Sequence, residues 1–364
     1  MFFKNQYQEI KEIGEKIFKN PELGYKEFKT KESVIEFLKK VNPEIEMEFF
    51  STTGIKTTLG SGKSVNMAFI GELDAVYAPS HWCSDKESGA AHNCGHHTQI
   101  AITLALYNYF YTTGAYKNLD YTLTFIFIPA EEYLDLSYRE KLQKDGVINY
   151  YGGKPEAMRL GIFDDIDIGV CVHAIGGSFT ERTSEINCDL AGFLYKKYTF
   201  RGSASHAGFD PFSGKNAYSM SNIFQVALGL MRQQLKDSEH VRMNPIVMES
   251  DMSTNVIPNF IKVGTDLRTK SVEYMKAVAD RIDKAAMGSA ICLDGEVEAE
   301  TQMGYLPFVQ DRYIGQFVVD AFTEQSEIKT LWNNKFISAA GDIGDLSFMV
   351  PCIQIGYSGF AGTI

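Results

Sequence analysis

Residues 121–132 read YTLTFIFIPAEE, an apolar run that ends directly before two adjacent glutamates. Residues 65–70, VNMAFI, form a second apolar run, and acidic residues follow it closely. Both runs are rich in residues that favour buried strands. Residues 100–110, between them, are apolar enough for a core helix. Strand, helix and strand in this order predict a parallel α/β sheet, with functional residues at the carboxyl ends of its strands.

The remaining patterns predict a second, inserted domain. Residues 165–173 read as another strand of the first sheet, and residues 8–19 and 31–41 as amphipathic helices. From about residue 187 the sequence pattern changes, and we expect strands at 194–200, 259–268 and 296–302 and helices at 217–236 and 272–287. A core helix is expected afterwards at 313–322. The predicted fold class is α/β: a catalytic metal-binding domain, 1–186 and 303–364, with a central mixed, mostly parallel sheet flanked by helices, plus an inserted α+β lid and dimerisation domain, 187–302.

Composition excludes several classes of protein. The 364 residues carry a net charge of -11 without a basic run, so nucleic acid is not expected as a partner. No apolar stretch reaches the roughly 18 residues of a membrane span, and the start lacks the pattern of a signal peptide. The six cysteines are scattered, unlike a disulfide scaffold. We therefore expect a cytoplasmic protein without a membrane partner.

Residues 92–97, HNCGHH, place one thiol and three imidazoles within six positions. These ligand types suit zinc, manganese or cobalt. A histidine-rich loop with a structural cysteine is the alternative, because short histidine clusters alone are a weak signal.

Two further signals follow predicted strands. In Glu131-Glu132 one carboxylate can bind a metal while its neighbour accepts a proton from water, although two exposed loop acids are the simpler interpretation. His173 ends another strand, where a buried core histidine is the ordinary interpretation. Because all these residues lie near the strand ends of one predicted sheet, coincidence is a strained explanation.

The sequence at this point resembles the M20 family of peptidases, and within it the carboxypeptidase-like amidohydrolases and the aminobenzoyl-glutamate or aminoacyl-dipeptide hydrolases. The similarity spans nearly the whole chain. It is carried by segments in the family's order and spacing: NPELGYKE at 20–27, GELDA at 71–75, HNCGH at 92–96, PAEE at 129–132, GGK at 152–154 and FDDID at 163–167 leading to His173.

The resemblance implies a site with two divalent metal ions. Cys94 would bridge the ions, His96, His173 and Glu132 would be further ligands, and Glu131 would be the general base. A bridging thiolate is reasonable because two nearby cations lower the pKa of a thiol strongly. Asp74 matches the acid that supports the metal site, although an acid at a strand end can also cap a helix.

The inserted domain also carries family patterns. His206, in GSASHAG at 202–208, would donate a hydrogen bond to the developing oxyanion, with a homodimer through the lid domain placing it across the interface. A surface loop histidine is the alternative. Asn255 and Arg268 would bind a substrate carboxylate, for which arginine is suited. Packing within the lid explains both nearly as well.

Two departures from the family pattern stand out. His97 occupies a position where relatives carry Asp or Asn, and it either binds metal or packs. Residues 340–345 and 359–363 follow the C-terminal pattern, but the expected last histidine ligand would come after Ile364. By this comparison the chain is expected to lack that ligand and a closing helix. His81 and Cys83 are expected to be structural.

The sequence therefore predicts a metal-dependent amidohydrolase or peptidase that cleaves an amide bond in a small N-acyl amino acid, aminoacyl or dipeptide-like substrate. Glu131 would take a proton from the attacking water and return it to the leaving amine. One alternative is a catalytically impaired protein of the same fold that binds a metal or ligand. Another is a metal-independent hydrolase with Cys94 as nucleophile and His96 or His97 as base, which leaves Glu131 and Glu132 unexplained.

Overall fold

The computed structural model describes residues 2–250, 253–324 and 327–359. The chain divides into two compact units. Unit 1 comprises residues 1–189, 309–335 and 341–364, and unit 2 comprises residues 190–308 and 336–340. The predicted insertion at 187–302 lies almost entirely within unit 2, which also takes in a short return segment at 336–340.

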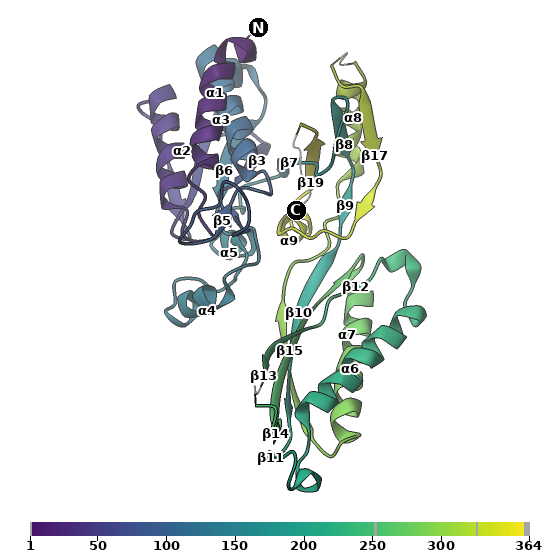
Figure 1. The fold of residues 1–364 in the computed structure, drawn as a ribbon. Coiled ribbons are helices and arrows are strands. Elements are labelled where there is room, and N and C mark those ends of the chain that lie inside the picture. The colour runs from purple at the N-terminus through teal and green to yellow at the C-terminus, as the bar shows by residue number, and fades with distance from the viewer. Residues whose placement is uncertain (1, 251–252, 325–326, 360–364) are drawn as a thin grey trace. The chain divides into compact units, whose positions relative to one another are not determined.

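Unit 1 is built on an eight-stranded mixed sheet (Figure 1). Its order is β1 (Glu48–Phe50), β2 (Gly54–Leu59), β6 (Thr122–Ile128), β3 (Asn66–Glu72), β7 (Ile168–Ala174), β19 (Cys352–Tyr357), β8 (Thr183–Ile186) and β17 (Thr330–Asn333). The four adjacent strands β6, β3, β7 and β19 run parallel to one another. The predicted mixed, mostly parallel α/β sheet is confirmed.

Three long helices pack on the sheet of unit 1 through an apolar core (Figure 1). These are α1 (Phe2–Phe18), α2 (Phe28–Val41) and α3 (His96–Thr113). Phe125 and Phe127 of β6 contribute to this core because every residue of β6 is buried. Helix α3 begins at His96, four residues earlier than predicted, so this histidine lies on the first turn of a helix.

The other helices of unit 1 are shorter: η1 (Ala115–Asn118), α4 (Leu136–Lys144), α5 (Gly153–Arg159), α8 (Arg312–Glu324) and α9 (Ile343–Ser347). The prediction of a core helix at 313–322 was wrong in character. Helix α8 covers that range, but Gly315 is its single buried residue, and Tyr313 and Phe317 are mostly exposed. A helix with one buried face shows the same apolar content as a core helix when the sequence is scanned for composition alone.

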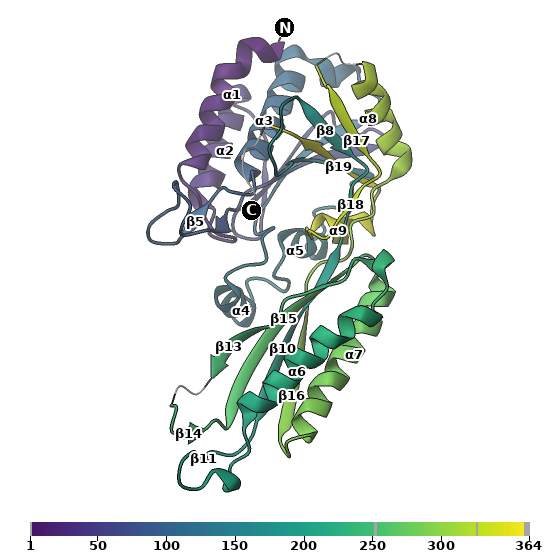
Figure 2. The same cartoon turned by 45° about the vertical axis from the view of Figure 1, so that its right-hand side comes forward.

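Unit 2 is an α+β unit in which two helices cover one face of an antiparallel sheet (Figure 2). The helices are α6 (Ala217–Met231) and α7 (Val272–Ile291). The sheet contains β12 (Arg242–Met243), β15 (Phe260–Thr269), β10 (Gly192–Arg201) and β16 (Glu296–Met303), with β13 (Ile246–Ser250) paired to β15. Tyr198, Phe200 and Phe224 lie in the core between the two layers.

Shorter elements complete the description: β4 (Val76–Tyr77), β5 (Ala90–Ala91), β9 (Asp189–Leu190), β11 (Ser205–His206), η2 (Pro211–Ser213), η3 (Arg232–Gln234), η4 (Asp237–Glu239), β14 (Val256–Ile257) and β18 (Phe336–Ile337). Within the described ranges, no helix combines the length and the apolar character needed to cross a membrane.

Candidate metal centre

The strand ends of unit 1 gather the chemically active side chains at one edge of the sheet. Strand β3 ends on Glu72, β6 ends one residue before the PAEE segment at 129–132, and β7 carries His173 next to its last residue. Because β6, β3 and β7 are parallel neighbours, their carboxyl ends lie side by side. The first turn of α3 brings His96 to the same edge.

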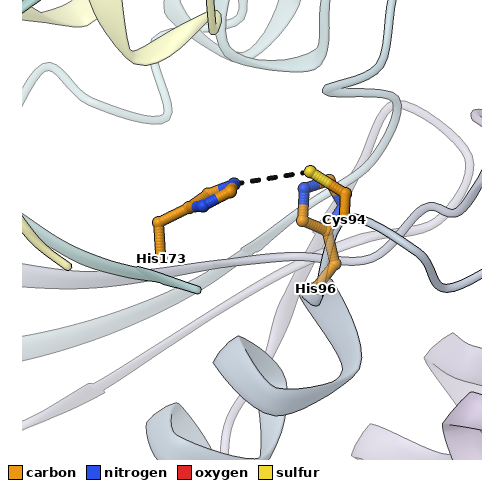
Figure 3. A group of neighbouring side chains, drawn as sticks. All are labelled: Cys94, His96 and His173. Carbon is orange, nitrogen blue, oxygen red and sulfur yellow. Dashed lines mark hydrogen bonds between the residues drawn. The ribbon is translucent and has the colours of Figure 1, made fainter. Parts of the chain in front are cut away.

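Cys94, His96 and His173 converge on one point (Figure 3). Each offers one ligand atom, and these atoms all lie within 4.8 Å of one another. The Sγ atom of Cys94 lies 3.5 Å from Nε2 of His173. The structure thus brings three of the four residues predicted as metal ligands into one cluster, and their thiol and imidazole groups form a donor set typical of zinc and related ions.

Backbone carbonyls fix the tautomers of both histidines. Nδ1 of His96 lies 2.9 Å from the carbonyl oxygen of Asp74, and Nδ1 of His173 lies 2.8 Å from that of Ala174. A carbonyl oxygen can only accept, so each Nδ1 carries a proton and donates it. In the neutral rings Nε2 is then left with a lone pair, as in histidines that bind metals.

A second group joins His96 to two carboxylates. Glu72, His96 and Glu131 also place ligand atoms within 4.8 Å of one another. Oε2 of Glu72 lies 3.1 Å from Nε2 of His96, yet that buried nitrogen has no hydrogen-bond partner among the described residues. Two acceptors at this distance repel unless a cation or a proton lies between them. These side chains therefore fit divalent ions, with Cys94, His96 and His173 as candidate ligands and the carboxylate of Glu131 beside them.

Asp74 supports the cluster from its buried position behind His96. One of its carboxylate oxygens lies 3.3 Å from Nδ1 of His96, and the other accepts a hydrogen bond from the backbone N–H of Glu132 at 2.9 Å. Asp74 is fully buried. These contacts orient a ligand histidine and the acidic turn together, as second-layer carboxylates do in metal sites.

The acidic turn after β6 is held in a conformation that few residues adopt. Ala130 has a φ of 54°, in the left-handed region. Its N–H donates to the buried Glu27 carboxylate at 2.8 Å, and the buried Arg139 side chain donates to the carbonyls of Ala130 and Glu132. These bonds fix the direction in which Glu131 and Glu132 leave the turn.

The electrostatics of the turn suit a proton acceptor. Burial raises the pKa of Glu131 well above its usual value, and the charges of Glu72 and Glu132 raise it further. Burial also raises the pKa of Glu132. For Cys94, burial and the charge of Glu132 raise the pKa, so the thiol keeps its proton in the absence of a cation.

Three residues of the site received no role from the sequence. Glu72, the buried Lys154 and the buried Asp342 form an ion cluster, and Oε2 of Glu72 lies 3.1 Å from Nε2 of His96. Glu72 and Lys154 lie in segments that carried the family resemblance, at the end of β3 and on the first turn of α5. Their position at strand and helix ends was the available signal, but the pairing depends on three segments far apart in the chain.

His97 points to a different environment from His96. Its ring packs 4.9 Å from the ring of Phe18 and 5.4 Å from that of His92. Burial, and then the proximity of His96, lower the pKa of His97 to about 4. The neighbouring pair His81 and Cys83 forms a local turn, in which the Cys83 N–H donates to Nδ1 of His81 at 3.2 Å.

The predicted substrate residues lie in unit 2, and the structure brings two of the three together. His206 on β11 pairs with β14, and the carbonyl of Asn255 accepts a hydrogen bond from Ala207 at 2.9 Å. Arg268 lies near the carboxyl end of β15, and its Nε donates a hydrogen bond to the carboxylate of Asp266 at 2.7 Å. The positions of these residues relative to the metal cluster stay predictions.

The sequence is similar to those of known hydrolases. No family model matches the chain. It is 27% identical over 308 residues to thermostable carboxypeptidase 2 of Saccharolobus solfataricus, covering 77% of this chain and 71% of that protein. It is 22% identical to one of the subunits of the p-aminobenzoyl-glutamate hydrolase of Escherichia coli, covering 92% of this chain and 66% of that protein.

The fold matches solved structures over almost its full length. One is the Bacillus subtilis YxeP protein, described as a dinuclear metal-binding peptidase from the M20 family, with a TM-score of 0.73 and 16% identity, covering 98% of this chain and 90% of that chain. The chain thus shares its fold with a protein of the M20 family, and its sequence is similar to those of a carboxypeptidase and an amide hydrolase.

Proposed function

We propose that this protein is a member of the M20 family, a metal-dependent hydrolase that cleaves an amide bond in a small N-acyl amino acid, aminoacyl or dipeptide-like substrate. The observation that carries the proposal is the convergence of Cys94, His96 and His173 beside the buried acids Glu72 and Glu131. The names of its relatives, a carboxypeptidase and a p-aminobenzoyl-glutamate hydrolase, support this substrate class.

The ligands of the proposal are Cys94, His96, His173 and Glu132, with two ions of zinc, manganese or cobalt. Such ions polarise a carbonyl and lower the pKa of water, which activates both partners of an amide hydrolysis. The chain's own contribution is positional, because backbone carbonyls direct the lone pairs of His96 and His173 toward Cys94.

Glu131 is the proposed base. It is buried, adjacent to the ligand group, and its pKa is raised by burial, which brings a carboxylate closer to the pKa suited to proton transfer near neutral pH. It takes a proton from the attacking water and delivers it to the nitrogen of the leaving amine. Asp74 holds His96 and the turn of Glu132 in place during these transfers.

A thiol mechanism is the second candidate. The predicted bases were His96 and His97, and the structure adds His173, whose Nε2 lies 3.5 Å from Sγ of Cys94, within reach of a Cys/His pair. The raised pKa of Cys94 argues against it, because a nucleophilic cysteine needs a lowered pKa. The two mechanisms differ in their response to EDTA. We expect chelation to abolish hydrolysis and zinc, manganese or cobalt to restore it, whereas activity that survives chelation would support the thiol.

Hydrolysis assays with N-acyl amino acids and dipeptides, combined with elemental analysis, test the proposal as a whole. The expected result is about two divalent ions per chain and metal-dependent release of an amine. Bound metal without hydrolysis of any amide would favour the alternative of a catalytically impaired binding protein. Absence of metal after reconstitution would overturn the metallohydrolase.

His206 fits the role of an oxyanion donor. Its Nδ1 accepts hydrogen bonds from the backbone N–H groups of Gly208 at 3.2 Å and Phe209 at 3.0 Å. Nδ1 therefore lacks a proton, and the exposed Nε2 carries one that it can donate. We propose that His206 donates a hydrogen bond to the developing oxyanion. We further propose that Asn255 and Arg268 bind a substrate carboxylate, and that the protein is a cytoplasmic homodimer formed through unit 2.

Mixed dimers test the action of His206 across the interface. Subunits with Glu131→Gln and subunits with His206→Ala should each be inactive and should recover activity after subunit exchange. Absence of recovery despite measured exchange would place His206 and Glu131 of one subunit at the same site. A strict monomer would contradict the dimer.

A further inference from the structure

A lysine without any exposed surface lies among the acids of the candidate metal centre. Lys154, on the first turn of α5, is 0% exposed. Its Nζ lies 2.5 Å from Oε1 of Glu72 and also contacts a carboxylate oxygen of Asp342. Its backbone N–H donates to the other oxygen of Asp342 at 2.8 Å. The two acids thus meet a single buried cation.

Lys154 fixes the carboxylate that faces His96. With Oε1 of Glu72 bonded to Lys154, Oε2 accepts a hydrogen bond from Gln99 at 2.8 Å and lies 3.1 Å from Nε2 of His96. The backbone N–H of Glu72 in turn donates to the Gln99 side chain at 3.1 Å. Every rotation of the Glu72 carboxylate breaks at least one of these contacts, so its free lone pairs are aimed at the ligand group.

The same lysine connects to the proposed base. Asp342, which holds Lys154 through both carboxylate oxygens, donates its backbone N–H to Oε1 of Glu131 at 3.3 Å. Lys154 is therefore bonded to one neighbour of His96 and to one neighbour of Glu131. Glu72 and Asp342 connect it to the site.

Stability alone does not explain the buried ammonium group of Lys154. Replacing a buried ion cluster by apolar residues of similar volume is often neutral or stabilising, because removing charges from water costs free energy that the pairing only offsets. The geometry points instead to orientation, because the ammonium group holds one oxygen of Glu72 and leaves the other facing His96.

We propose that Lys154 is a positioning residue that holds Glu72 as an oriented carboxylate toward the metal ions and thereby raises the affinity of the site for them. The inference rests on the proposed metal-dependent function. In metal sites, residues that hydrogen-bond to the ligands orient them, and the loss of such a residue weakens metal binding about 10- to 100-fold. The inference assigns this role to Lys154.

The chain offers a matched control in unit 2. Lys196 is 2% exposed, and its Nζ lies 2.8 Å from Asp283, in the core between the sheet and the helices. Lys196→Met and Lys154→Met each remove one buried ammonium from a carboxylate partner. Both substitutions should lower the melting temperature. If the role of Lys154 is purely structural, neither substitution should change the metal affinity of the folded protein.

The experiment measures the Kd for Zn²⁺ and for Mn²⁺ by competition with a chelating dye, with the melting temperature of each metal-free variant recorded in parallel. We expect Lys154→Met to weaken binding by about 10- to 100-fold and Lys196→Met to leave the Kd unchanged. In a double-mutant cycle, Lys154→Met should add little to the loss already caused by Glu72→Gln, because the lysine acts through that carboxylate.

Parent-like affinity in folded Lys154→Met, or losses that multiply in the double variant, would overturn the role of Lys154 while leaving the metal site intact. If Lys154→Met does not fold, Lys154→Gln takes its place, because the amide can still donate to Glu72 and Asp342 without the charge. A parent chain that binds neither ion would overturn the proposed function and this inference together, and the two failures are therefore distinguishable.

Discussion

Replacing Glu131 by glutamine separates proton transfer from metal binding. Glu131 is 8% exposed, and its Oε1 accepts the N–H of Asp342 at 3.3 Å, a bond that a glutamine oxygen can also accept. The substitution therefore keeps size and this contact and removes the proton acceptor. We expect turnover to fall by ~10²–10⁴, the usual contribution of general acid–base catalysis.

Stability supplies the control for this substitution. Because burial and neighbouring acids raise the pKa of Glu131, its folded-state pKa lies above its unfolded one. The ionised residue destabilises the metal-free fold increasingly as pH rises through that folded-state pKa. Glu131→Gln removes this effect, so the melting temperature of the metal-free variant at pH 8 should equal or exceed that of the parent.

The neighbouring acid gives the contrasting variant. Glu132→Gln should lose bound metal, as measured by elemental analysis after gel filtration, while Glu131→Gln should retain it. Turnover of Glu131→Gln within threefold of the parent would remove the proposed base. Metal loss on Glu131→Gln with retention on Glu132→Gln would mean that the two roles are reversed.

Three further substitutions test the surroundings of the site. Asp74→Asn should weaken metal binding about 10- to 100-fold in a chelator competition, because an amide whose oxygen accepts from the Glu132 N–H turns its own NH2 group toward the protonated Nδ1 of His96, and unchanged affinity would contradict its supporting role. Gly153→Ala should lower the free energy of unfolding by about 1–3 kcal/mol in urea titrations, since its Cβ would lie 1.6 Å from the carbonyl oxygen of Pro129, and a neutral result would refute this packing argument. Burial, followed by the charge of Asp74, raises the pKa of Glu27 to about 8. Its contribution to stability is therefore complete at acidic pH and is lost as pH rises through about 8. Glu27→Gln should flatten this decline of the melting temperature with pH, and an unchanged decline would assign it to other groups.

Most of the long elements of the fold were predictable because their patterns are local. The fully buried strand at 122–128 and the helix at 272–291 carry their own periodicity or apolar content. Strand β19 and the short α5 do not, because the first is recognised as a strand by its parallel pairing with β7 and the second has only seven residues. Pairings between distant segments leave no local periodicity.

The ligand cluster was predictable in composition and only partly in geometry. Parallel topology brings the ends of β6, β3 and β7 together, so Glu131 and His173 were expected near one another. The participation of Glu72 was not foreseen, because an acid at a strand end reads equally as solvent-exposed. Its function depends on the burial of Lys154 beside it, and a lysine in a sequence is ordinarily a surface residue.

The histidines show why residue type alone does not assign chemistry. His173 and His206 have the same side chain, yet the backbone gives them opposite tautomers. A carbonyl oxygen faces Nδ1 of His173, so its Nε2 presents a lone pair suited to a cation. Backbone N–H groups face Nδ1 of His206, so its Nε2 presents a proton suited to an anionic oxygen. The distinction lies in which backbone group a local turn directs at the ring, and a motif in the sequence records the histidine without that direction.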